Sequence, residues 1–154
     1  MRIFDSMADM ALCVGQEIAV SPWIRITQEQ VNQFAQATGD HQWIHIDVQR
    51  ANDGPFGGPI AHGFLTLSLL PLFFEQSINT PSVTMGVNYG LNKVRFPAPV
   101  PVGSNLRARI KLISYEALPG NGSQVVSEVT IEREGGGKPV CVAESIARRY
   151  EAAV

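Results

Sequence analysis

Three stretches in the second half of the sequence alternate apolar and polar residues, and this pattern constrains the fold more than any other feature. The stretches cover residues 105–116, 124–134 and 140–150. Because side chains of a β-strand point alternately to its two faces, a period of two predicts strands with one buried face. In the first stretch the predicted buried residues are Leu106, Ala108, Ile110 and Leu112.

Turns and one further strand complete the predicted sheet. Residues 119–122 and the glycine run at 135–137 have the composition of turns. Residues 83–96 have the composition of a long strand, and the proline-rich run at 97–101 ends it. Strands joined by such short turns are antiparallel, so the second half is predicted to form one antiparallel sheet.

The first half of the sequence is mainly helical in pattern. A short helix is predicted within residues 5–14, followed by short strands at 18–20 and 23–26. Thr27 and Gln30 have the spacing of a capping box, and Gly39 is placed to end the helix that they begin. Helices followed by an antiparallel sheet predict a single α+β domain over residues 1–154.

The strongly apolar segment 61–74 is predicted to be a central helix. So many of its residues are apolar that burial on several sides is expected. Pro71 is expected to kink or end this helix, because proline lacks a backbone N–H and its ring clashes with the preceding turn.

Composition excludes several classes of function. The formal net charge is -2 and no basic block is present, so no nucleic-acid partner is expected. No apolar stretch is long enough to span a membrane, and Asp5 and Asp9 interrupt the apolar N-terminus, so neither a membrane partner nor an export signal is predicted. Cys13 and Cys141 form no CxxC pair and are interpreted as free thiols, which favours the cytoplasm. Charged residues make up only 17%, which predicts extensive burial in a core or against a partner subunit.

All 3 histidines, His41, His45 and His62, lie in one region of the sequence beside Asp40. His41 and His45 have the i, i+4 spacing of zinc ligands on a helix. Gln42, however, stands where the zinc-protease pattern needs a general-base glutamate, so no metal is predicted. The alternative is a carboxylate–imidazole pair of Asp40 and His45 that holds a water molecule and transfers protons.

Gly63 is the candidate for binding a developing negative charge. It follows His62 at the start of the apolar helix, where backbone N–H groups have no partner within the helix. A glycine also lets a substrate approach the backbone closely. These features predict an oxyanion site suited to a thioester enolate.

Three blocks of the sequence resemble the MaoC-like dehydratases, the (R)-specific enoyl-CoA hydratases. They are FAQATGDHQWIHID at 34–47 with Ala51, FGGPIAHGF at 56–64, and NYGLNKVRFPAPVPVG at 88–103. The resemblance runs in order over nearly the whole chain and is greatest to the single-domain branch that includes nodulation-protein-N-like hydratases. The family commonly has Asn-Pro where this chain has Gln42-Trp43, a departure that bears on acyl-chain preference.

The resemblance implies a hot-dog fold, in which a long antiparallel sheet wraps around a central helix, and a homodimer. It implies that Asp40 and His45 are the catalytic pair and that the Gly63 N–H binds the thioester carbonyl. Trp43, His62 and Asn88 are further candidates for substrate binding. For His62 the alternative is a hydrogen bond that fixes the loop, and for Asn88 it is an ordinary strand position.

The predicted activity is reversible hydration of a trans-2-enoyl-CoA to an (R)-3-hydroxyacyl-CoA. Water attacks C3 and a proton returns to C2. The substrate is a thioester of coenzyme A or of an acyl carrier protein, and no cofactor is expected. Two other functions stay open on this scaffold, an acyl-CoA thioesterase and a non-catalytic module that binds acyl thioesters.

Overall fold

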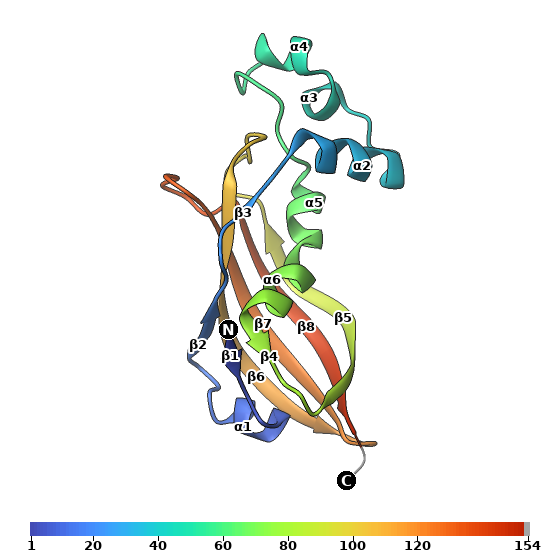
Figure 1. Ribbon diagram of the computed structural model, residues 1–154, viewed down its shortest axis with the longest axis vertical. Coiled ribbons are helices and arrows are strands. Elements are labelled where there is room, and N and C mark those ends of the chain that lie inside the picture. The colour runs from blue at the N-terminus through green and yellow to red at the C-terminus, as the bar shows by residue number, and fades with distance from the viewer. Residues whose placement is uncertain (153–154) are drawn as a thin grey trace.

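The computed structural model describes residues 1–152 and places the long strands in one antiparallel sheet (Figure 1). The order of the sheet is β2-β6-β7-β8-β5, and β3 also pairs with β6. Its strands are β2 (Glu17–Val20), β3 (Ile24–Arg25), β5 (Val83–Arg95), β6 (Asn105–Leu118), β7 (Gly122–Arg133) and β8 (Cys141–Glu151). The predicted strands are therefore confirmed with small shifts at their ends, while residues 153–154 of the predicted domain lie outside the described residues.

The alternation in β6 and β7 separates a buried face from a charged face. Leu106, Ala108, Ile110 and Leu112 of β6 are all fully buried. On the outer face Arg107 and Arg109 both form ion pairs with Glu132 of β7, at 2.8 and 2.7 Å. The apolar face needs a second layer, and helices supply it.

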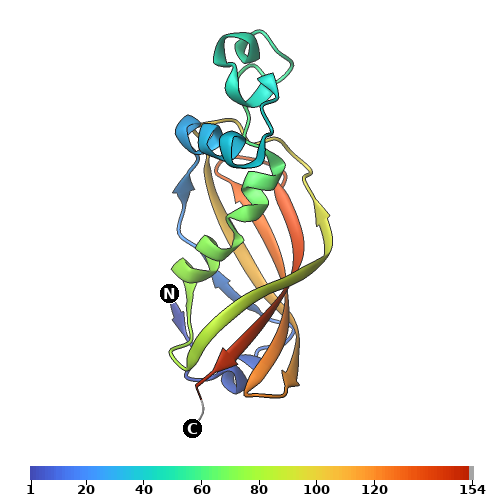
Figure 2. The same ribbon diagram turned by 90° about the vertical axis from the view of Figure 1, so that its right-hand side faces the viewer.

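Two consecutive helices, α5 (Gly63–Ser68) and α6 (Leu70–Ser77), cross the inner face of the sheet (Figure 2). The predicted single helix over 61–74 is thus divided at Leu69, and Pro71 lies in the first turn of α6. A proline there has no N–H to donate back to Leu67, so the chain starts a new helix instead of continuing the old one.

The expectation that this helical segment is buried on several sides was wrong for the single chain. Leu65 and Phe73 are buried against the sheet, whereas Phe64 is 68% exposed. The sheet covers one side of α5 and α6 and leaves the opposite side open.

Helix α2 (Gln28–Thr38) begins and ends as its sequence predicts. The Thr27 side chain accepts a hydrogen bond from the Gln30 N–H, and the Gln30 side chain accepts one from the Thr27 N–H. Gly39 ends the helix in the left-handed conformation with φ 80°. The short N-terminal helix is also present, as α1 (Met7–Ala11). These caps fix where the loop that carries Asp40 leaves α2.

Two short helices project beyond the end of the sheet, α3 (Trp43–Ile46) and α4 (Val48–Asn52) (Figures 1 and 2). Asp47 caps α4 by accepting a hydrogen bond from the Arg50 N–H. The returning chain is tied to α3 because the Ile60 N–H donates to the Ile44 carbonyl at 3.0 Å. This bond places the start of α5 next to α3.

One pairing was not predicted. The two-residue strands β1 (Arg2–Ile3) and β4 (Ile78–Asn79) form a small parallel sheet. A two-residue strand has no periodicity that sequence analysis can detect. Within residues 1–152, no helix is long and apolar enough to cross a membrane.

Candidate active site

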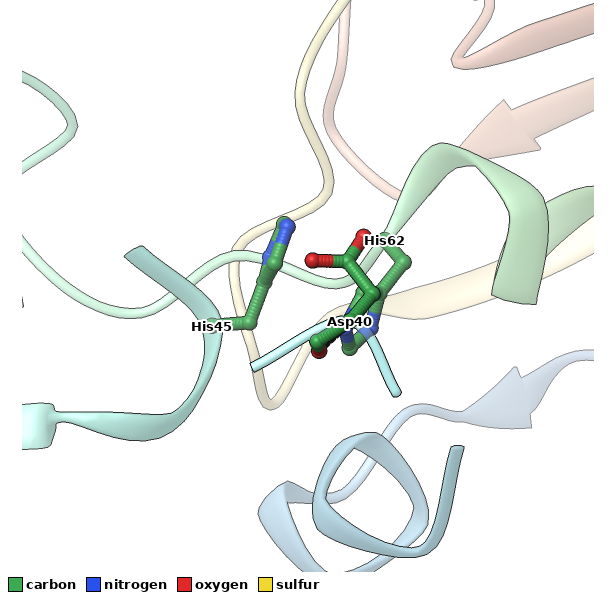
Figure 3. Close-up of side chains that lie close together, drawn as sticks. All are labelled: Asp40, His45 and His62. Atoms are coloured by element: carbon green, nitrogen blue, oxygen red, sulfur yellow. Dashed lines mark hydrogen bonds between the residues drawn. The ribbon is translucent and has the colours of Figure 1, made fainter. Parts of the chain in front are cut away.

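Asp40, His45 and His62 meet at the point where α2, α3 and α5 approach one another (Figure 3). A carboxylate oxygen of Asp40 and one ring nitrogen from each histidine lie within 4.8 Å of one another. Asp40 is exposed, while His45 and His62 are 7% and 2% exposed. The cluster is therefore open to solvent on the side of Asp40, and a substrate can enter there.

His45 is held as a neutral imidazole with one free nitrogen. Its Nδ1 lies 2.6 Å from the Ile60 carbonyl, and because a carbonyl only accepts, Nδ1 carries the hydrogen. Burial lowers the pKa of His45 below its usual 6.5, and nearby His62 lowers it further, although the Ile60 hydrogen bond and Asp40 act in the opposite direction. The remaining nitrogen, Nε2, is then an acceptor of protons, as a general base must be.

Two further contacts hold the His45 backbone. The side-chain amide of Gln28 in α2 donates to the His45 carbonyl at 2.7 Å. The His45 N–H donates to the Gln42 carbonyl at 3.0 Å. Sequence analysis missed the roles of Gln28 and Ile60, because neither a glutamine in a helix nor a backbone carbonyl carries a local signal for them.

His62 supports the loop that carries Asp40. Its Nε2 donates to the backbone carbonyl of Asp40 at 3.0 Å, and its Nδ1 is buried without a hydrogen-bond partner among residues 1–152. The ring stacks on His45, with centroids 3.9 Å apart and planes 28° apart. His62 thus contacts both members of the predicted pair, through a hydrogen bond to the Asp40 backbone and through its ring on His45.

The Asp40 carboxylate points toward the His45 ring (Figure 3). One of its oxygens accepts a long hydrogen bond of 3.4 Å from the Gln42 N–H. An ionised carboxylate has about four lone-pair sites, so it can still accept hydrogen bonds from a bound water. Asp40 and the neutral His45 are thus two acceptors that face one small volume.

Gly63 is the first residue of α5, and its N–H makes no hydrogen bond to another described residue. A Cβ at this position would lie 3.0 Å from the ring of Phe96, so the ring would have to shift by a few tenths of an ångström. The glycine thus allows close contact between the start of α5 and Phe96. Phe96 also contacts the exposed Phe64 ring edge-on, with centroids 6.0 Å apart.

The geometry of the two histidines favours proton transfer over metal binding. Asp40, His45 and His62 are a possible set of metal ligands by proximity alone. A tetrahedral zinc ion requires imidazole lone pairs that converge on it at about 2.0–2.1 Å. The stacked rings of His45 and His62 instead direct their lone pairs along roughly parallel planes. His41, the other histidine of the i, i+4 pair, is exposed and outside the cluster.

The remaining predicted site residues lie farther out. Trp43 in α3 packs against Gly54, and the Arg50 guanidinium lies 4.3 Å from its ring centroid. Asn88 lies on β5 and lines a cavity beneath α5 and α6 instead of joining the cluster. Substrate contacts for Trp43 and Asn88 stay predictions.

The fold and the cluster define a class of protein, the hot-dog proteins that carry a carboxylate and a histidine at the start of the central helix. A monoamine oxidase regulatory protein from Archaeoglobus fulgidus has this fold, with a TM-score of 0.76, 23% identity and coverage of 98% of each chain. The family profile described as MaoC like domain matches residues 9–134. The chain belongs to this family of MaoC-like dehydratases and is a hydro-lyase.

Relatives of known name support this placement over the whole chain. The chain is 57% identical over 149 residues to the 3-hydroxyacyl-thioester dehydratase Z of Mycobacterium tuberculosis. This alignment covers 96% of the chain and 98% of the relative. It is 44% identical to the nodulation protein N of Rhizobium meliloti, covering 92% and 89%. The unliganded R-hydratase PhaJ1 of Pseudomonas aeruginosa superposes with a TM-score of 0.68 at 26% identity, covering 90% and 83%.

Proposed function

We propose that this chain catalyses the reversible hydration of a trans-2-enoyl-CoA to the (R)-3-hydroxyacyl-CoA in fatty acid metabolism. One observation carries the proposal. The Asp40 carboxylate and the neutral His45, whose Nδ1 is held by the Ile60 carbonyl, face the same volume. Two proton acceptors are what a water molecule needs in order to be held by both of its hydrogens.

The proposed mechanism divides the work between this pair and the start of α5. The water oxygen forms a bond to C3 of the enoyl group as one water proton passes to the Asp40/His45 pair. The electron pair of the double bond moves toward the thioester oxygen, which the Gly63 N–H stabilises. A proton from the pair then reaches C2. A single donor at such an oxyanion is worth about 3–4 kcal/mol in comparable sites.

The (R) configuration and the substrate class are proposed from the relatives. PhaJ1 is named an R-hydratase, and dehydratase Z is named for 3-hydroxyacyl thioesters. Thioester hydrolysis would require attack on the carbonyl carbon, and no relative described above is named for it. The reaction needs no metal or cofactor in this proposal, because the thioester itself activates C2 and C3.

The defining experiment follows the loss of enoyl-thioester absorbance with crotonyl-CoA and with longer trans-2-enoyl-CoAs. In the reverse direction, (R)-3-hydroxybutyryl-CoA should be dehydrated and the (S) isomer should not. Thiol release without loss of the enoyl chromophore would instead identify a thioesterase. Failure of the wild-type protein to turn over enoyl-CoA of any chain length would contradict the proposal.

A homodimer is also proposed, and β5 supports it. This strand of 13 residues ends the sheet, with β8 as its partner on one edge. Met85, Val87, Tyr89 and Leu91 are all more than 40% exposed. A long apolar edge strand is a template for pairing with another chain. A cytoplasmic location is proposed as well, since Cys13 and Cys141 are both free thiols.

A further inference from the structure

A cavity of about 710 Å³ lies between the helices α5 and α6 and the inner face of the sheet. The helical wall is formed by four apolar residues, Leu67, Leu70, Pro71 and Phe74, and by the polar Ser68 and Glu75. Val125 and Ala147 contribute apolar surface from β7 and β8. Small-molecule sites typically have volumes of about 300–1,000 Å³, so the cavity can hold a substantial acyl group.

One cation, Arg149, lines this cavity. Arg149 belongs to β8 and lines the cavity from the sheet side. The residues that share its strand parity are the small or apolar Cys141, Ala143, Ser145 and Ala147, and Glu151 at the end of β8. Gly86 is its neighbour on β5, and a Cβ built there would lie 3.4 Å from the Arg149 Nη1, in van der Waals contact with it. The guanidinium lies 6.0 Å from the ring centroid of Phe74.

The Arg149 guanidinium has no ion pair or hydrogen bond to any residue in the described part of the chain. The three ion pairs found there involve Arg107 and Arg109. Glu151, two positions along β8, already accepts hydrogen bonds at one oxygen from Ser82 and from the Met7 N–H, at 2.6 and 3.1 Å. Burial lowers the pKa of Arg149. Arg149 is half-buried. A guanidinium with no protein partner keeps its donors available, and a carboxylate can bind it through two parallel hydrogen bonds.

The cavity lies farther along the helices than the reacting centre, and its lining includes none of Asp40, His45, His62 and Gly63. Leu67 lies one helical turn beyond Gly63, and Phe74 lies 11 residues beyond it. At about 1.5 Å of rise per residue, Phe74 lies at most roughly 16 Å along the helical path from Gly63. The Arg149 guanidinium lies 6.0 Å from the Phe74 ring centroid. An acyl chain whose thioester is bound at Gly63 can follow the cavity toward Arg149 only if it is of medium or greater length.

We propose that Arg149 is a specificity residue that binds a carboxylate at the far end of the acyl chain. The favoured substrates are then 2-enoyl thioesters of medium or long chain that carry a terminal carboxylate, in preference to chains of the same length that end in a methyl group. This inference rests on the proposed hydratase function for its substrate class. A purely apolar chain would exclude water from the guanidinium without replacing its hydrogen bonds.

The experiment compares two trans-2-enoyl-CoAs of equal length, one with a terminal carboxylate and one with a terminal methyl group, across a series of lengths. Wild-type enzyme should favour the carboxylate in kcat/KM by about tenfold to a hundredfold, as expected for hydrogen bonds to a charged group. The preference should appear only at lengths that reach Arg149. In Arg149→Met the ratio of kcat/KM for the carboxylate chain to that for the methyl chain should fall to one or below. Crotonyl-CoA is too short to reach Arg149, so this variant should turn it over at the wild-type rate.

The matched control is Arg148→Met. Arg148 is the next residue on β8, but its side chain bonds Gln124 at 3.0 Å and lies 3.6 Å from the Tyr89 ring centroid. The Arg148→Met substitution should therefore leave the carboxylate preference unchanged. Equal preference for the two chain ends in wild type, or a preference that survives Arg149→Met, would overturn the proposal.

A binding measurement separates this inference from the proposed function. Calorimetry with saturated acyl-CoAs, one ending in a carboxylate and one in a methyl group, requires no turnover. Tighter binding of the carboxylate by wild type, lost in Arg149→Met and kept in Arg148→Met, supports the role of Arg149 even if the enzyme hydrates nothing. Equal affinities in wild type contradict it even if crotonyl-CoA is hydrated.

Discussion

The imidazole rings of His45 and His62 stack with their centroids 3.9 Å apart, a contact that disfavours a positive charge on His45. His62 is one of the causes that lower the pKa of His45, after burial. Two positive charges at this separation would repel in an environment of low dielectric constant. Burial first, and the stacked His62 second, therefore favour the neutral form of His45 that can act as a base.

The first prediction concerns the pH dependence of activity. Because the pKa of His45 is lowered from 6.5, the acidic limb of the kcat/KM profile should fall at a pH below 6.5. His62→Phe retains an aromatic ring on His45 but removes the neighbouring imidazole, so the limb should move to higher pH. The profile is measured with crotonyl-CoA between pH 5 and 8, and an acidic limb above 6.5 in wild type would contradict the assignment of His45 as the neutral base.

The same shift predicts a dependence of stability on pH. In the unfolded chain His45 takes up a proton near 6.5, whereas in the folded chain it does so only at lower pH. The stability contribution of neutral His45 is thus fully present above 6.5 and is lost as the pH falls from there toward the lowered pKa, by at most about 1.4 kcal/mol per pH unit. Denaturant unfolding of wild type and His45→Gln should show this slope in wild type alone, and an equal slope in both would remove His45 as its source.

The second prediction tests the catalytic pair. Asp40→Asn and His45→Ala should each lower kcat by about 10²–10⁴-fold, the usual contribution of positioned acid–base groups. His41→Ala is the matched control, because His41 is exposed and outside the cluster. All three variants are compared by circular dichroism and thermal unfolding before turnover is measured. Turnover like that of wild type in either pair variant would remove that residue from the mechanism.

The third prediction isolates the Gly63 N–H. Gly63→Ala and Gly63→Pro both add a Cβ that meets Phe96, so both are made in a Phe96→Ala background. Proline is tolerated at the first position of a helix, and the extended conformation of His62 (φ -60°, ψ 139°) suits a residue before proline. The proline variant lacks the N–H and should have a kcat about 10²–10³-fold below that of the alanine variant. Equal rates for the two folded variants would show that the N–H does not stabilise the transition state.

The fourth prediction concerns metal ions. The stacked geometry of His45 and His62 does not let their lone pairs converge on one ion, so dialysis against EDTA should leave crotonyl-CoA turnover unchanged. Metal analysis of the purified protein is the accompanying measurement. Loss of activity on dialysis that is restored by a divalent cation would establish a metal site at Asp40, His45 and His62.

Much of the fold was predictable because its determinants are local. The capping box at Thr27 and the left-handed Gly39 are set by a few neighbouring residues, and both were confirmed. The alternation in β6 defined its buried face correctly. The break at Leu69 and the exposure of Phe64 could not be predicted, because they depend on how the helices lie on the sheet.

The candidate site was predictable only in its reacting side chains. Asp40 and His45 lie close in the sequence, and the family resemblance named them. The contacts that set the state of His45 come from the Ile60 carbonyl and from His62, both of which the fold brings to it over a distance in sequence. Arg149 carried a weak local signal, a charged residue at a strand position where its neighbours are small, but its cavity depends on the packing of α5 and α6.

The last prediction concerns the free edge of β5. If two copies pair through this edge, a charge on it should separate them, because lysine at an edge strand opposes pairing. Val87 and Leu91 are 44% and 45% exposed, so Val87→Lys/Leu91→Lys should fold and yet shift the mass measured by light scattering from dimer to monomer. Ile3→Lys/Leu12→Lys is the matched control, since these exposed apolar residues lie outside the large sheet and should leave the dimer intact. A dimer that persists in the β5 variant would show that the subunits meet at another surface. A wild-type protein that is monomeric at micromolar concentration would contradict the homodimer itself.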